Sequence, residues 1–195
     1  MSTATADPAT APLAAAVAEM AARLARVTVE VRSRGRSAAH GGPVGSGIVW
    51  HPDGLILTNA HVAHGDVVVV LSDGRARPAR LVARDPRRDL AALVVDGTDL
   101  PAAEIGDSSA LRVGELVLAV GNPHGLLRAL SAGLVHAAGE RFIQADLRLA
   151  PGNSGGPLAD ARGCVVGLNA MIVGGLAVAV PSNLARRFVR EQLRA

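Results

Sequence analysis

Residues 149–158 read LAPGNSGGPL, which places Ser154 among three glycines and two prolines. Glycine recurs where the backbone must turn sharply or approach another group closely. The stretch therefore fits an ordinary turn, or a loop whose N–H groups surround a nucleophilic serine. Its letters GNSGG also match the G-x-S-x-G turn of α/β-hydrolases. The rest of the chain decides among these interpretations.

The order of the candidate residues along the chain separates the hydrolase classes. A serine hydroxyl needs a neighbouring base, and all six histidines precede Ser154. This excludes the order serine, acid, histidine of the α/β-hydrolases. The subtilisin order, acid then histidine then serine, belongs to a parallel α/β architecture that the strand pattern of this chain does not fit. The order histidine, acid, serine remains, and it belongs to proteases built from two β-barrels.

Short apolar runs separated by turn signals such as HPDG, SDG and DARG fill the middle of the chain. Roughly eleven to twelve such runs favour an all-β barrel or sandwich. An Ala-rich amphipathic helix is expected at about residues 13–26, and a second helix after Pro181 with Ser182 or Asn183 as its N-cap. The uncharged stretch 163–185 predicts two strands joined by a Gly-Gly turn, not a membrane span.

His61 is the candidate base, because it directly follows the apolar run LILTNA and opens a short turn. His64 forms an H-x-x-H pair with it, but no Glu follows His61 and no third ligand is evident, so we expect no metal site. Asp89 stands at the mouth of the apolar run LAALVV, where partial burial suits the acid that orients an imidazole. Asp146 is the second candidate for that acid.

Composition limits the other functions. The 195 residues suffice for one large domain or two closely packed small ones. All 20 basic residues are Arg, but they alternate with acids and lack accompanying aromatics, so nucleic-acid binding is not expected. The single cysteine, Cys164, lies in an apolar run and is expected to be a small buried side chain. The N-terminus has no recognisable signal peptide, which leaves the compartment open and slightly favours the cytoplasm.

Several motifs together resemble the HtrA/DegP-type serine proteases over about residues 14–190. These motifs are GSGIVWHPDGLILTNAHV (45–62), DLAAL (89–93), GNPHGL (121–126), FIQADLRLAPGNSGGPL (142–158) and GLAVAVPSN (175–183). The resemblance implies an all-β, chymotrypsin-like double six-stranded β-barrel with short N- and C-terminal helices. The expected organisation is a disordered segment 1–12 and a protease domain 13–195, with barrels at roughly 27–105 and 106–181 and no PDZ domain.

The resemblance also implies roles for individual residues. His61 matches the general base, Asp89 its orienting acid and Ser154 the nucleophile. The N–H groups of Gly152 and Ser154 match the oxyanion hole, with Asn153 setting the loop between them. The remaining matches are to substrate-binding residues: Ala170, Met171 and Ile172 on the strand that pairs with substrate, and Leu149, Gly175, Leu176 and Ala177 around an uncharged pocket for an apolar side chain.

The implied function is a serine endopeptidase acting on unfolded or damaged proteins, without metal or cofactor and without membrane or nucleic-acid partners. The loop SAGLVHAAGERFIQ (131–144) is shorter than the regulatory loop of the family. The N-terminal segment lacks the aromatics that hold the family's trimer, so a trimer is left open but disfavoured. Two alternatives remain: a protease-fold module that binds chains in a chaperone-like way with an inactive site, and an esterase on the same fold.

Overall fold

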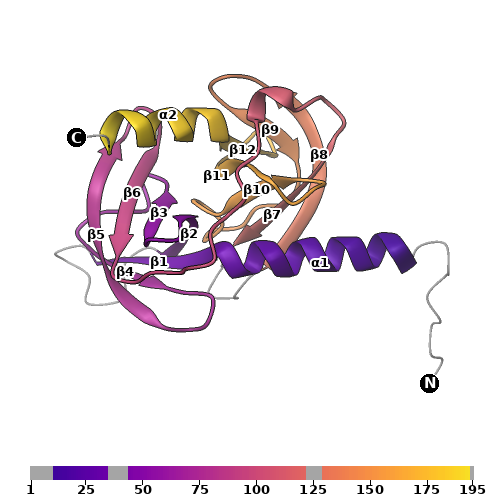
Figure 1. Cartoon of the computed structure of the whole chain (residues 1–195). Helices are drawn as coiled ribbons and strands as arrows, with labels where there is room; N and C mark the ends of the chain where they lie inside the picture. Colours follow the sequence, from indigo (N-terminus) through magenta and orange to yellow (C-terminus); the bar gives the residue numbers. More distant parts are fainter. Residues whose placement is uncertain (1–10, 35–43, 122–128, 194–195) are drawn as a thin grey trace.

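The computed structural model describes residues 11–34, 44–121 and 129–193. In this part of the chain, twelve strands form two closed six-stranded antiparallel barrels, with a helix at either end (Figure 1). This confirms the predicted all-β, chymotrypsin-like double barrel.

The first barrel has the strand order β1-β2-β3-β6-β5-β4. Its strands are β1 (Thr28–Arg34), β2 (Val44–His51), β3 (Leu55–Thr58), β4 (Asp66–Val70), β5 (Ala76–Asp85) and β6 (Leu90–Val95). In β4 the sequence DVVVV buries Val67 and Val69 fully and their neighbours less, because successive side chains point to opposite faces of a strand. Such inward residues from every strand fill the interior with valine, leucine and isoleucine.

The second barrel has the order β10-β11-β12-β9-β8-β7. Its strands are β7 (Leu116–Gly121), β8 (Ala129–Ala138), β9 (Ile143–Asp146), β10 (Pro157–Asp160), β11 (Val165–Val173) and β12 (Leu176–Pro181). The uncharged stretch that a hydropathy scan flags forms β11 and β12. Gly174 and Gly175 join them with φ values of 59° and 85°, a backbone region that favours glycine. Among the described residues, no helix has the length and apolarity to cross a membrane.

The two helices fasten the barrels to each other. Helix α1 (Ala11–Val27) contacts β1 and β7, and α2 (Ser182–Gln192) contacts β6, β11 and β12. A third apolar cluster joins Leu24 of α1 and Phe188 of α2 to strands of both barrels. Figure 1 shows α2 lying across the first barrel and reaching the second. The geometry between the barrels is therefore fixed by packing as well as by the connecting chain.

The expected N-cap of α2 is wrong, because the residue that caps this helix is Pro181, which has no side chain able to accept a hydrogen bond. Ser182 instead donates from its hydroxyl to the Gly106 carbonyl at 2.8 Å, and Asn183 donates from Nδ2 to Asp107 at 2.6 Å. Asp107 also caps the short 3₁₀ helix η1 (Ser108–Ala110). These two polar side chains thus tie α2 to the connection between the barrels.

Candidate active site

His61 and Asp89 lie together at the edge of the first barrel. His61 Nδ1 is 2.9 Å from Asp89 Oδ2 and 3.0 Å from Oδ1, and the His61 backbone N–H donates to Oδ1 at 3.1 Å. The carboxylate thereby holds both the ring and the backbone of the histidine. The Asp89 side chain is 21% exposed and the His61 side chain 50% exposed, so the ring reaches solvent while the acid is largely shielded.

Three further hydrogen bonds cross between the segments that carry His61 and Asp89, and the sequence analysis did not identify them. Asn59 Nδ2 donates to the Asp89 carbonyl oxygen at 3.0 Å. In the opposite direction, Arg84 of β5 donates from Nε and Nη2 to the Ala60 carbonyl oxygen at 3.0 and 2.9 Å. Asp89 has a φ of 52°, which is uncommon outside glycine. The Asn59 bond fastens the Asp89 backbone directly before β6.

The loop before Ser154 is anchored to the first barrel. Ser46 of β2 donates from its hydroxyl to the Gly152 carbonyl at 2.7 Å, and its backbone N–H donates to the Ser154 carbonyl at 2.8 Å. A side chain at Gly155 would collide with the Ser46 carbonyl oxygen, and the φ of Gly155 is 85°. Glycine is thus required at position 155, which explains one of the residues around the serine.

The N–H groups at Gly152 and Ser154 are unengaged in the described part of the chain, whereas the neighbouring ones are occupied. Asn153 N–H donates to the Ala150 carbonyl at 3.0 Å, and Gly155 N–H donates to the Asn169 carbonyl at 2.7 Å. The Asn153 side chain is buried, with 6% of its surface exposed. The loop therefore leaves two N–H donors, at Gly152 and Ser154, that could donate hydrogen bonds to a developing oxyanion.

The Ser154 hydroxyl donates to the Ala170 carbonyl oxygen of β11 at 2.9 Å. No hydrogen bond joins Ser154 to His61. Catalytic hydrogen bonds are often long or misaligned without substrate. The loop brings the serine to the first barrel through Ser46, but the hydroxyl proton is directed to the second barrel.

Ala170, Met171 and Ile172 lie on β11 beyond the part that pairs with β10. The pairing of β11 with β10 ends at Leu168, while its pairing with β12 continues through Val173 on the other side. Met171 and Ile172 are 50% and 53% exposed. Beyond Asn169, one edge of β11 is therefore open to an added strand.

The residues expected around the apolar pocket have different environments. Leu149 is half-buried and packs against the interior of the second barrel, and Ala177 is buried in the same cluster. Leu176 is half-buried, and Gly175 is exposed in the β11–β12 turn. Ala177 lies opposite Ile172 in the ladder. These residues thus adjoin the strand that carries the open edge.

The other titratable candidates lie apart from His61. Asp146 is exposed at the end of β9 and makes no bond to His61. His64 has no carboxylate partner among the described residues, and its backbone N–H donates to the Ser33 hydroxyl at 3.3 Å. The described residues contain no group of three His, Cys, Asp or Glu side chains placed to hold a metal ion. Burial raises the pKa of the Cys164 thiol, with Asp160 adding to the effect.

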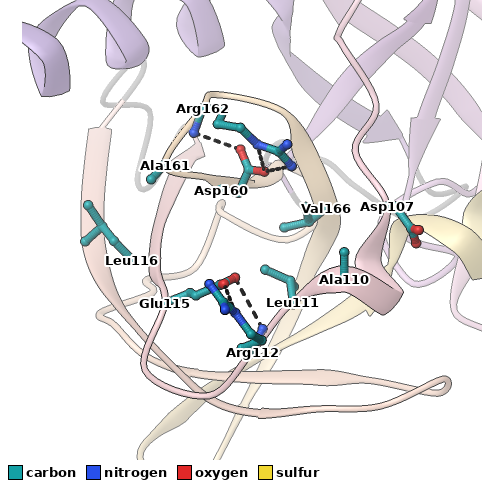
Figure 2. Close-up of a pocket in the computed structure, with 10 residues that line it drawn as sticks. All are labelled: Asp107, Ala110, Leu111, Arg112, Glu115, Leu116, Asp160, Ala161, Arg162 and Val166. Atoms are coloured by element: carbon teal, nitrogen blue, oxygen red, sulfur yellow. Dashed lines mark hydrogen bonds and ion pairs between the residues drawn. The ribbon is translucent and has the colours of Figure 1, made fainter.

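A cavity of about 580 Å³ lies in the second barrel, away from His61 and Ser154. Figure 2 shows two ion pairs in its lining, Arg112 with Glu115 and Arg162 with Asp160. The Arg162–Asp160 pair closes the turn between β10 and β11, where the Asp160 carboxylate also accepts the backbone N–H of Arg162 and Cys164. The arginine and acidic side chains of these two ion pairs in the cavity therefore stabilise turns of the second barrel.

The comparisons with known proteins agree with this geometry. Residues 45–168 match the family model described as a trypsin-like peptidase domain, and the chain belongs to that family. Within this family, its protease domain is of the HtrA type, as the similar proteins below indicate.

A probable periplasmic serine endoprotease, DegP-like, from Pseudomonas savastanoi pv. phaseolicola (strain 1448A / Race 6) is 44% identical over 168 residues, covering 78% of this chain. One from Chlamydia pneumoniae is 38% identical over 167 residues, covering 77% of this chain. The chain spans only 35% and 34% of the length of these relatives.

Solved structures give the same result. HtrA-type protease AlgW with tripeptide has a TM-score of 0.84 and 34% identity, and the match covers 91% of this chain and 63% of that one. AlgW with decapeptide has a TM-score of 0.81 and 31% identity, covering 90% and 67%. The slight preference of the sequence analysis for the cytoplasm is wrong, because the similar relatives are named as periplasmic. The lack of a recognisable signal peptide was a weak argument for the cytoplasm.

Proposed function

We propose that this domain is a serine endopeptidase that hydrolyses peptide bonds in unfolded or extended polypeptides, and that it acts in the periplasm, as the names of its relatives suggest. The observation that carries the proposal is the His61–Asp89 pair next to a loop that presents Ser154 and two unengaged N–H groups. A base, an orienting acid, a nucleophile and an oxyanion site are the parts that acyl transfer by a serine requires.

In the proposed reaction, His61 Nε2 takes the proton of Ser154 as Oγ attacks the carbonyl carbon of the scissile peptide bond. Asp89 accepts from His61 Nδ1–H, which fixes the tautomer and stabilises the imidazolium. The N–H groups of Gly152 and Ser154 stabilise the oxyanion. In related sites, one such donor lowers the activation barrier by about 2.7–4 kcal/mol. His61 then protonates the leaving amine, and water hydrolyses the acyl-enzyme with His61 again as base.

We further propose that substrate adds as an extended strand to the open edge of β11 at Ala170–Ile172, a known mode of peptide recognition. AlgW is solved with a tripeptide and a decapeptide, which supports peptide binding by a domain of this kind. The side chain before the scissile bond would enter a pocket formed by Leu149 and Gly175–Ala177. These residues are uncharged, so we expect cleavage after small or medium aliphatic residues.

One observation favours a second function. Because the Ser154 hydroxyl donates to Ala170 and not to His61, the domain could bind extended chains without cutting them. A fluorophosphonate probe and unfolded casein distinguish the two functions. A peptidase labels at Ser154, loses the label in Ser154→Ala and degrades casein. Casein binding with neither labelling nor cleavage would reject the proposed peptidase and support the binding module. Labelling with turnover of simple esters only would indicate an esterase.

A further inference from the structure

A groove of about 630 Å³ adjoins the candidate site on the side of Asp89 and the open edge of β11. Its apolar lining comes from β11, β12, α2 and the residue before β9, and includes Phe142, Met171, Val173, Val178, Val180 and Leu184. Phe142, Met171 and Val173 are each about half exposed, at 48%, 50% and 51%. Large apolar side chains that stay half exposed beside a proposed substrate strand indicate a surface that binds an apolar part of a ligand.

The charges around this groove are mostly positive, and some of them are unpaired. Arg87, Arg88 and Arg141 line it together with Asp89. Arg88 is held by Glu191 and Asp85, and the Asp89 carboxylate is engaged by His61. The guanidinium groups of Arg87 and Arg141 make no ion pair or hydrogen bond with any described residue, and both side chains are exposed. The groove therefore offers two unused positive charges beside an apolar surface.

The topology of β11 tells which part of a bound chain meets the groove. Every neighbouring pair of strands in this barrel is antiparallel. A strand added to β11 in the same sense would run from Val173 towards Ala170 and Ser154. The residues beside Met171–Val173 thus precede the scissile bond. Because side chains alternate between the two faces of a sheet, every second residue of this segment lies on the face of Met171 and Val173, over the groove.

Resting on the proposed function, we propose that this groove selects substrates whose segment N-terminal to the scissile bond carries an apolar side chain and, two residues away on the same face, a glutamate or aspartate. The apolar side chain covers Met171, Val173 and Phe142, and the carboxylate pairs with Arg87 or Arg141. Arginine suits this role because its planar guanidinium stays charged and binds a carboxylate through two parallel hydrogen bonds.

The first test is a scan of fluorogenic peptides with one neutral parent sequence. Glutamate is placed at each of the four residues before the scissile bond in turn, with glutamine at the same place as the matched control. We expect kcat/KM to be about two- to five-fold higher for glutamate than for glutamine at alternate positions only, the size of an exposed ion pair. The preference should shrink as salt is raised. Equal rates for glutamate and glutamine at all four positions would overturn the inference.

The second test uses Arg87→Gln, Arg141→Gln and the double variant, with Arg80→Gln as control. Arg80 is also an exposed arginine, on β5, but it does not line the groove. The glutamate-to-glutamine ratio should fall towards one in the double variant and stay at the wild-type value in Arg80→Gln. A ratio retained in the double variant would contradict the role of these arginines. An acidic peptide that inhibits cleavage of the neutral parent without being cut would assign the groove to a regulator instead of a substrate.

A binding measurement separates failure of this inference from failure of the proposed function. Fluorescence anisotropy of the same labelled peptides on Ser154→Ala reports affinity without turnover. Tighter binding of the glutamate peptide, lost in the Arg87→Gln, Arg141→Gln background, supports the groove even if no peptide is cleaved by the wild-type protein. If the wild type cleaves both peptides and Ser154→Ala binds both with equal affinity, the peptidase function stands and the role of the groove is rejected.

Discussion

The hydroxyl of Ser154 donates a hydrogen bond of 2.9 Å to the carbonyl oxygen of Ala170. Ala170 begins the open edge of β11, so this carbonyl is also the first acceptor that an added substrate strand would meet there. A substrate N–H and the serine hydroxyl would then compete for one oxygen. Substrate binding would release the hydroxyl towards His61, the partner it needs for proton transfer.

This competition predicts the effect of N-methylation on a peptide substrate. Methylating the one N–H that faces Ala170 should raise KM and also lower kcat. We expect kcat/KM to fall by about two- to ten-fold, which corresponds to the free energy of one hydrogen bond. Methylating the adjacent N–H, which points away from β11, is the matched control and should change kcat little. Steady-state kinetics on the three peptides check this. An unchanged kcat for the first methylated peptide would mean that the Ala170 bond does not restrain Ser154.

The acid that orients His61 can be tested by comparing two carboxylates. Asp89→Asn removes the negative charge at His61 Nδ1, so we expect kcat to fall by about 10⁴-fold, as in related triads. Asp146→Asn, at an exposed site without a bond to His61, should retain nearly full kcat. Titration with an active-site probe corrects for misfolded protein. The opposite result, with Asp146→Asn inactive and Asp89→Asn active, would reject the assignment.

The crossing bond from Arg84 to Ala60 predicts a positioning effect on the histidine. Arg84→Lys loses the paired Nε and Nη2 donors, which lets the segment before His61 shift. Because small displacements of a base are costly, we expect kcat to fall by about ten-fold with KM little changed. Arg80→Lys on the same strand is the control. If thermal stability drops in Arg84→Lys while kcat per folded molecule is retained, the bond is structural only.

Asp107 predicts a pH-dependent contribution to stability. Hydrogen bonds from Ser109 and then from Asn183 lower the pKa of its carboxyl from 3.8 to about 2. A depressed pKa means that the ionised group stabilises the folded chain above its unfolded pKa, and that this is lost as the pH falls from about 3.8 to about 2. Asp107→Ala should therefore lower the free energy of unfolding at neutral pH.

The difference between Asp107→Ala and wild type should shrink over that acidic window. Urea unfolding of both proteins at a series of pH values measures it. Asp99→Ala, at a second exposed aspartate that has no partner among the described residues, serves as the control. A difference that is independent of pH would mean that Asp107 stabilises the chain by packing and not through its charge.

Much of the fold was predictable because its signals are local. Short alternating runs such as DVVVV become strands whatever their partners are, and Gly174–Gly175 turns the chain without a side-chain clash. The N-cap of α2 was predicted wrongly for the complementary reason. Ser182 and Asn183 have the right chemistry for a cap, but Gly106 and Asp107, which are distant in sequence, offer these side chains other partners.

The sequence by itself determined the fold class and the set of candidate residues, because the order of His61, Asp89 and Ser154 excluded the other serine hydrolases. Only the tertiary structure decided which partners these residues have. Closing two barrels and packing them together brings Ala170 to Ser154, Arg84 to the segment before His61, and Arg87 and Arg141 to one groove. Such contacts depend on packing between distant strands, which no local pattern of residues encodes.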